Sequence, residues 1–291
     1  MTENNPSHPN GPNFNADRAG SAVSRRQILR TAGVLVAGGF AAGGWSAADA
    51  ATKKKTPLKR STSATTKAAS ATQTTRALTP AANCSVIPQE TGGPFPGDGT
   101  NGANVLTQPG IVRSDVRSSF GKSTTLAKGV LLKLRLTVNS TATCGAFAGA
   151  AVYIWHCDQG GNYSLYSEAV LNENYLRGVQ VAAADGTLEF TTIFPAAYPG
   201  RWPHIHFEIY PTLARATTGA NAIGTSQLAF PEATCRQVYA TSGYEASVAN
   251  MSRTQLANDR VFSDGVTKQT PTISGSLASG LAAALTISVD P

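Results

Sequence analysis

Residues 187–210 read TLEFTTIFPAAYPGRWPHIHFEIY and hold two segments in which apolar residues alternate with other types. The first, Thr187–Phe194, follows an Asp-Gly turn, and the second, Trp202–Tyr210, follows a break rich in Pro and Gly. Alternation with a period of two, bounded by turn residues, is typical of β-strands. The stretch therefore predicts two strands, and His204 and His206 lie on one face of the second.

The rest of the chain extends this pattern to an all-β domain. Further strands are expected at residues 129–138, 150–157 and 284–289, and short helices at 233–239 and 245–255. Short strands between Gly-, Pro- and Asn-rich turns indicate a β-sandwich of mostly antiparallel strands, with short helices in its connecting loops. Residues 81–291 are long enough and apolar enough to form one such domain.

The positive charge of the chain lies in its N-terminal part. The formal net charge is +7, but residues 1–80 hold 11 Lys and Arg against 3 Asp and Glu. Residues 81–291 hold 13 basic and 14 acidic residues. A domain without net positive charge is a poor partner for nucleic acid, so no nucleic-acid binding is expected.

Residues 1–50 resemble a twin-arginine signal peptide. The sequence SRRQIL at 24–29 is followed by a weakly apolar stretch and by Ala48-Asp49-Ala50, which has the form of a cleavage site. Residues 51–80, rich in Ala, Thr, Ser and Lys, are expected to be a disordered linker. We therefore expect export by the twin-arginine machinery to an extracellular, cell-wall-associated or periplasmic location. No integral membrane segment is expected after cleavage of the signal, whose exact site the sequence leaves open.

His204 and His206 are candidate metal ligands. Two imidazoles side by side form half of a site for iron, copper, zinc or nickel. One interpretation adds His156 and Glu208 and gives a cupin-like metalloenzyme. Structural zinc is disfavoured, because the cysteines lack C-x-x-C spacing.

The four cysteines suit disulfides in an exported protein. They are Cys84, Cys144, Cys157 and Cys235. Their pairing is left open by the sequence, with Cys84–Cys144 as one candidate.

The strings around the histidines carry a family resemblance. Residues 198–206 have the pattern Y-P-x-R-x-x-H-x-H, and residues 154–163 have I-W-x-x-D-x-x-G-x-Y. TGGPF at 91–95 and YLRGVQ at 175–180 extend the match. Together these segments resemble the intradiol ring-cleavage dioxygenases, non-haem ferric enzymes that include protocatechuate 3,4-dioxygenase and catechol 1,2-dioxygenase. The resemblance runs discontinuously from about Cys84 to the C-terminus.

The resemblance implies a non-haem Fe(III) cofactor with four protein ligands. These are Tyr163, Tyr198, His204 and His206. Two phenolates would neutralise two of the three charges of a hard ferric ion, which prefers anionic oxygen. The resemblance further implies that Tyr198 leaves the iron and takes a substrate proton, and that Arg201 stabilises negative charge on the ring. The residues expected to line the substrate pocket are Gly93, Pro94, Gln180 and Ile193, whereas His156 is expected to stay outside the site as a packing or supporting residue.

The implied reaction cleaves a catechol-type diol between its two hydroxyl-bearing carbons. Both atoms of O2 enter the product, a muconate-type diacid. The alternative is a carbohydrate- or cell-wall-binding β-sandwich with a vestigial metal site, and the complete set of ligand types argues against it. Neither the particular catechol nor the oligomeric state follows from the sequence.

Overall fold

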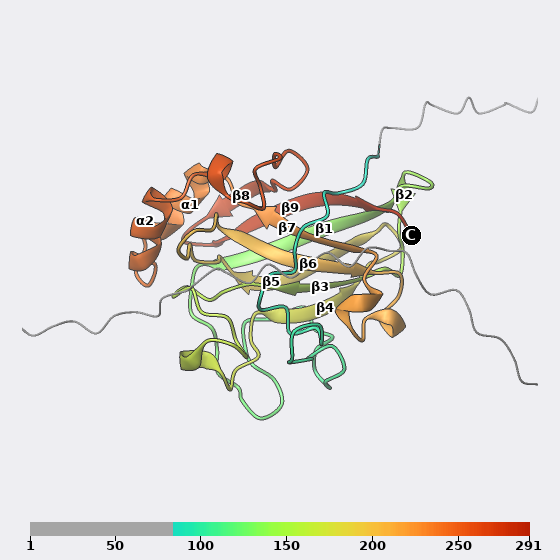
Figure 1. The fold of residues 1–291 in the computed structure, drawn as a ribbon, viewed down its shortest axis with the longest axis horizontal. Helices are drawn as coiled ribbons and strands as arrows, with labels where there is room; N and C mark the ends of the chain where they lie inside the picture. The colour runs from blue at the N-terminus through green and yellow to red at the C-terminus, as the bar shows by residue number, and fades with distance from the viewer. Residues whose placement is uncertain (1–83) are drawn as a thin grey trace, which may run out of the picture. The chain divides into compact units, whose positions relative to one another are not determined.

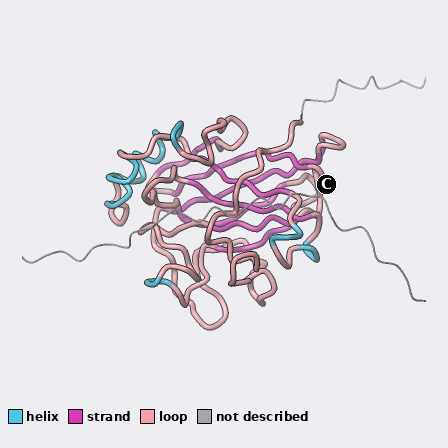
Figure 2. The backbone as a smooth tube through the Cα atoms, in the orientation of Figure 1, coloured by secondary structure: helices cyan, strands magenta, loops and turns pink. Residues whose placement is uncertain are grey.

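Residues 84–291 are described by a computed structural model, drawn in Figure 1. The predicted signal peptide, residues 1–50, and the predicted linker, residues 51–80, lie outside the described residues. The described part contains two β-sheets and two short α-helices. Figure 2 shows the strands gathered in the centre with long loops outside them. None of the helices in residues 84–291 is long and apolar enough to cross a membrane.

The first sheet has five strands and mixed direction. Its strands are β1 (Leu131–Ser140), β2 (Gly145–Ala146), β5 (Thr187–Ile193), β8 (Thr272–Ser276) and β9 (Gly280–Val289). Strand β1 pairs parallel with β9 and antiparallel with β2 and β5, and β8 pairs antiparallel with β9. As predicted, β1 buries one face, since Leu132, Leu134 and Leu136 are fully buried whereas Lys133 and Arg135 are exposed.

The second sheet is antiparallel and holds the predicted H-x-H strand. Its order is β4 (Arg177–Val181), β3 (Ala151–Trp155), β6 (His204–Tyr210) and β7 (Gly224–Ala229). Residues of both sheets share one hydrophobic core. Every residue of β3 and β6 is buried, because the inner face meets this core and loops cover the outer face. The polar residues of β6 therefore lie in a closed environment.

The helices also lie where the sequence predicts them. They are α1 (Glu232–Tyr239) and α2 (Glu245–Ser252), which lie together at one end of the sheets in Figure 1. Four 3-10 turns complete the elements: η1 (Glu168–Val170), η2 (Leu213–Arg215), η3 (Gly219–Asn221) and η4 (Leu256–Asn258). The all-β class is thus confirmed, while β2, β4, β7 and β8 were not predicted. Strands β7 and β8, GTSQLA and TISGS, have too few apolar residues to show alternation.

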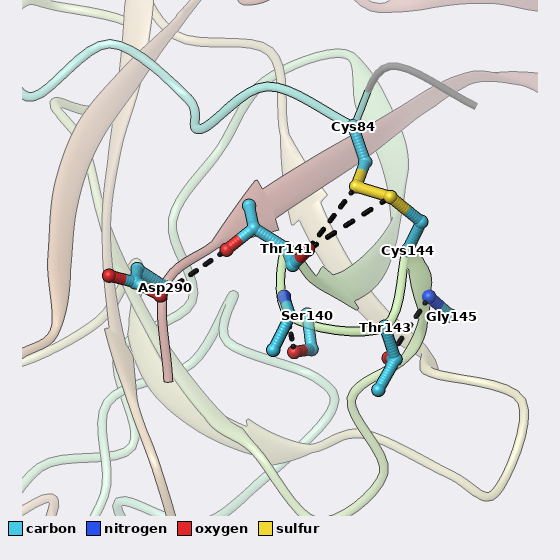
Figure 3. The surroundings of a disulfide bond; sticks show 8 residues. Cys84, Ser140, Thr141, Thr143, Cys144, Gly145 and Asp290 are labelled. Atoms are coloured by element: carbon cyan, nitrogen blue, oxygen red, sulfur yellow. Dashed lines mark hydrogen bonds between the residues drawn. A yellow bond between two sulfur atoms is a disulfide. The ribbon is translucent and has the colours of Figure 1, made fainter. Parts of the chain in front are cut away.

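A disulfide joins Cys84 to Cys144, the pairing that the sequence left as one candidate (Figure 3). The two Cα atoms are 5.5 Å apart, whereas Cys157 and Cys235 are free and buried. The segment after Cys84 is then held by main-chain hydrogen bonds, from Ile87 N to the Ser288 carbonyl of β9 and from Glu90 N to the Thr225 carbonyl of β7. The disulfide therefore anchors a strap, residues 84–91, that touches both sheets and leads to the Thr91–Phe95 motif.

Removal of this disulfide is expected to destabilise the domain. Cys84→Ser should lower the free energy of unfolding by about 2–5 kcal/mol, because the bridge closes a long loop and restricts the unfolded chain. Urea unfolding without reductant measures this. Cys144→Ser and the double variant should lose the same amount as Cys84→Ser. A loss under about 0.5 kcal/mol in all three variants would contradict the expectation.

Candidate metal centre

Strand β6 brings His204 and His206 to the outer face of the four-stranded sheet. Residues two apart on a strand point the same way, and both side chains are only 2% exposed. The ring of His206 stacks on that of Trp155 in the neighbouring strand β3, with centroids 4.8 Å apart and planes inclined by 6°. The sheet thus fixes the position of both imidazoles.

The orientation of His204 is set by its own loop. Its Nδ1 lies 2.5 Å from the carbonyl oxygen of Trp202. A carbonyl only accepts, so Nδ1 carries the proton and Nε2 presents its lone pair. This arrangement is the usual one for metal-binding histidines, in which a neighbouring acceptor fixes the tautomer.

Three side-chain atoms converge on Nε2 of His204. The Oη of Tyr163 lies 3.3 Å away, the Oη of Tyr198 3.2 Å and the Nε2 of His206 3.1 Å. The four residues come from three places: Tyr163 from the loop after β3, Tyr198 from the loop after β5, and the histidines from β6. The structure therefore brings together all four of the ligands predicted from the sequence.

These separations fit one bound metal ion. Two atoms each about 2.1 Å from a metal are about 3.0 Å apart at a right angle and about 3.4 Å apart at the tetrahedral angle. The observed distances of 3.1, 3.2 and 3.3 Å fall in this range. Two imidazoles and two phenols form a mixed nitrogen and oxygen donor set that suits iron.

Burial keeps the histidines in the neutral form that binds metal, whereas the tyrosines need a bound cation to become deprotonated. It lowers the pKa of His204 and of His206 well below the ordinary value, so both imidazoles are neutral at pH 7. Burial also raises the pKa of Tyr198 to about 12 and that of Tyr163 well above its ordinary value. A bound cation would reverse this shift, because it favours the deprotonated phenolate.

The cupin-like set of His156, His204, His206 and Glu208 is not supported. Within residues 84–291, no three His, Cys, Asp or Glu side chains gather in a group suited to a metal ion. His156 makes other contacts, with Nδ1 2.8 Å from the Cys157 carbonyl and Nε2 2.7 Å from Oγ1 of Thr192. Glu208 accepts a hydrogen bond of 2.5 Å from the Tyr210 hydroxyl. Both residues thus lie outside the donor cluster.

The known proteins that are similar to this chain are dioxygenases. A dioxygenase family model, Dioxygenase_C, matches residues 129–204. Chlorocatechol 1,2-dioxygenase of Rhodococcus opacus is 39% identical over 67 residues, which are 23% of this chain and 26% of that protein. The match thus spans about a quarter of the curated relative. An intradiol ring-cleavage dioxygenase structure from Tetranychus urticae is 27% identical, with a TM-score of 0.56, over 72% of this chain and 96% of that one.

The chain is therefore similar to dioxygenases over residues 129–204, and its fold is similar to that of an intradiol ring-cleavage dioxygenase. A second dioxygenase structure, 27% identical with a TM-score of 0.57, covers 72% of this chain and 95% of its own. The family-model match includes three of the four donor residues, Tyr163, Tyr198 and His204.

Arg201 lies beside the donor cluster and is firmly held. Its Nε donates to the carboxylate of Asp259 at 2.9 and 3.2 Å, and its Nη2 donates to Oε1 of Gln227 at 2.6 Å. The charge of Arg201 contributes to the lowered pKa of His204 and His206, after the larger effect of burial. Neither Asp259 nor Gln227 was predicted, since Asp259 lies in a loop without a motif and Gln227 in a strand without alternation.

The Thr91–Phe95 motif forms a wall over the donors. A Cβ added at Gly93 would lie 3.3 Å from Cε1 of His206, and the φ of Gly93 is +69°, so glycine is required here on both counts. The ring of Phe95 lies 5.0 Å from that of Tyr163. Pro94 between them is exposed, and its carbonyl accepts a hydrogen bond from the side chain of Asn101. Of the predicted pocket residues, Gly93 therefore lies at the site and Pro94 at its edge.

A buried arginine locks this wall to the loop of Tyr163. All five N–H groups of Arg177 are used: Nε donates to Ser164 Oγ, Nη1 to the Pro96 carbonyl and Tyr153 Oη, and Nη2 to the carbonyls of Phe95 and Ser164. The distances are 2.8–3.1 Å, and Arg177 is 1% exposed. The side chain thus joins two segments that meet at the donor cluster.

Gln180 is not brought to the donors. It pairs with Val152, whereas Arg177 and His206 both pair with Trp155. Cross-strand partners share a face, and residues three apart on one strand lie on opposite faces. Gln180 therefore points to the other side of the sheet from His206.

Ile193 is also away from the donors. It ends β5 in the other sheet and belongs to a small separate cluster with Ala127, Tyr175 and Leu176.

The buried His156 predicts a dependence of stability on pH. Burial lowers the pKa of His156 to about 4, below the ordinary 6.5. Between these two pH values the imidazole is neutral in the folded protein and protonated in the unfolded chain. This contribution to stability is complete above pH 6.5 and is lost as the pH falls toward 4. When the pH is lowered from about 7 to 5, the free energy of unfolding should fall less in His156→Gln than in wild type. The difference between the two losses should be on the order of 1–2 kcal/mol. Denaturant titrations at both pH values measure the difference, and parallel losses would contradict it.

Proposed function

We propose that this chain is an exported, non-haem Fe(III) intradiol dioxygenase that cleaves catechol-type diols with O2 to muconate-type diacids. The observation that carries the proposal is that Oη of Tyr163, Oη of Tyr198 and Nε2 of His206 all lie within 3.1–3.3 Å of His204 Nε2. A vestigial site in a carbohydrate-binding module would not need to keep this complete donor set buried and oriented.

Bound Fe(III) would supply Lewis-acid activation of the chelated diol. The two neutral imidazoles and the two phenols would hold it, and Trp202 keeps His204 in the required tautomer. Tyr163 is suited to a permanent ligand, because it is 2% exposed and lies beneath Phe95.

Tyr198 is suited to accept a substrate proton. It is only half-buried and lies on a Pro- and Gly-containing loop, so it has more freedom to move than Tyr163. Without a cation, burial raises the pKa of Tyr198 to about 12. Its phenolate, formed at the metal and then released from it, would therefore be a strong enough base to take a proton from a catechol hydroxyl. We assign this proton to Oη of Tyr198.

Arg201 would stabilise negative charge on the bound ring. A guanidinium held by a buried carboxylate and an amide is preorganised and needs no rearrangement during the reaction. Its two contacts use Nε and Nη2, and none of the described residues accepts a hydrogen bond from Nη1. Nη1 is therefore the group that would face the substrate.

Export and architecture complete the proposal. The disulfide between Cys84 and Cys144 supports an oxidising compartment, in keeping with the twin-arginine pattern of residues 1–50 and the linker at 51–80. The shared core of the two sheets supports the β-sandwich. Gly93 and Pro94 would bound the substrate pocket.

The activity is tested by oxygen uptake with catechol, protocatechuate, hydroxyquinol and caffeate. The purified protein should be burgundy-red from charge transfer between tyrosinate and iron. Tyr163→Phe and Tyr198→Phe should each weaken the visible band and lower oxygen uptake. Tyr239→Phe is the matched control, because its buried hydroxyl donates to the Pro195 carbonyl away from the donors. A folded protein that is colourless and free of iron would rule out the proposal.

Substitution of Arg201 should separate charge stabilisation from metal binding. Arg201→Met is expected to lower kcat by about 10²–10³-fold, the effect of losing one preorganised group. The iron content should remain that of wild type, since Arg201 is not a ligand. Steady-state kinetics and metal analysis measure both quantities. An unchanged kcat would remove Arg201 from the proposed mechanism.

A further inference from the structure

The carboxylate of Asp259 is buried near the donor cluster, and both of its oxygens accept hydrogen bonds. The side chain is fully buried and lies in the loop between α2 and β8. Its Oδ2 accepts from Arg201 Nε at 2.9 Å and from the Trp202 backbone N–H at 2.6 Å. Its Oδ1 accepts from Arg201 Nε at 3.2 Å and from the Val261 backbone N–H at 2.9 Å. One carboxylate thus binds two consecutive residues of the loop that leads into β6.

The two residues that Asp259 holds serve different parts of the site. Arg201 is the cation beside the donors, and Asp259 is its only ion-pair partner among the described residues. Trp202 is the residue whose carbonyl lies 2.5 Å from Nδ1 of His204. The same Trp202 is therefore bound at its N–H by Asp259 and at its carbonyl by His204, in a continuous chain of hydrogen bonds.

The strength of these contacts follows from their burial. Hydrogen bonds to an ionised group are stronger than neutral ones, and exclusion of water strengthens them further. The exposed pair of Arg236 with Glu232 has the same chemistry, at 2.5 Å, but side-chain exposures of 65% and 55%. Such a surface pair contributes little. Arg201, by contrast, is 18% exposed on its side chain, and Asp259 is not exposed at all.

The opposite side of the guanidinium is bounded by other groups of the same loop and of β7. The ring of Phe262 lies 5.7 Å from Cζ of Arg201 and 6.4 Å from the ring of His204. Gln227 fixes Nη2, and its own Nε2 donates to the Thr91 carbonyl at 2.8 Å. The guanidinium is therefore held at Nε and at Nη2, and Asp259 supplies its charged contact.

We propose that Asp259 is a positioning residue for the dioxygenase reaction, which fixes the guanidinium of Arg201 and, through the Trp202 peptide, the imidazole of His204. This inference rests on the proposed function of the site. Asp259 does not touch iron or substrate; it acts on the reaction through the two residues that do.

The test is a double-mutant cycle in the full-length, iron-loaded protein. Asp259→Asn keeps the shape of the side chain but removes its charge, and it should lower kcat by about tenfold or more. In the Arg201→Met background the same change should lower kcat by less than about twofold, because the group that it positions is already absent. Equal losses in both backgrounds would show a merely structural role and overturn the inference.

Iron release provides a readout that does not depend on activity. Loss of iron to an excess of chelator should be faster in Asp259→Asn by about threefold or more, because His204 is less well oriented. Arg201→Met should release iron at the wild-type rate. Glu232→Gln, which breaks the exposed pair, should match wild type in kcat and in iron release. A wild-type release rate in Asp259→Asn would overturn the link to His204.

A second variant covers the case in which Asp259→Asn does not fold. Asp259→Glu keeps the carboxylate but displaces it by one methylene, and the same cycle and chelator assay apply. A wild-type protein that neither binds iron nor consumes O2 would overturn the proposed function, and with it this inference. If the wild type is active but the Asp259 and Arg201 substitutions lower kcat independently of each other, only this inference would be overturned.

Discussion

One hydrogen bond, between Nδ1 of His204 and the carbonyl of Trp202, decides what the centre of this protein can do. It fixes the proton on Nδ1 and leaves the Nε2 lone pair facing Tyr163, Tyr198 and His206. With the other tautomer the same four residues would present an N–H group to a cation. Burial keeps the imidazoles neutral and the phenols protonated, so the four donor groups carry no positive charge. The site is therefore arranged to take a cation from outside.

The surroundings of this bond come from segments that are far apart in the sequence. The strap of residues 84–91, anchored by a disulfide, leads to Gly93 above His206, and the loop of Asp259 closes the other side. Arg177 joins the wall to the loop of Tyr163 through five hydrogen bonds. The sheet supplies the histidines, and the loops exclude water and hold the remaining groups. This division explains why the strands β3 and β6 are buried on both faces.

The local sequence pattern was sufficient to predict the strands and helices in which apolar residues recur at a regular spacing. Strands β1, β5 and β6 and helix α1 lie within a few residues of their predicted bounds, because their alternation or their spacing is strong. Strands β4, β7 and β8 were missed, since β7 buries polar Ser226 and Gln227 and β8 is largely exposed. Burial of polar residues depends on partners that no local window contains.

The site shows the same limit. The H-x-H spacing placed both histidines on one face, and the motif resemblance located the tyrosines, which no periodicity would have found. Gln180 was placed wrongly because strand register, which a sequence motif does not carry, turns it to the opposite face. Gln227 and Asp259 were missed because only the tertiary structure brings them to Arg201.

Anomalous diffraction at the iron absorption edge, from crystals of the iron-loaded protein, tests the central claim most directly. We predict a single peak about 2 Å from four atoms, Oη of Tyr163 and of Tyr198 and Nε2 of His204 and of His206. An iron peak elsewhere in the molecule, with these four side chains still hydrogen-bonded only to one another, would contradict the account.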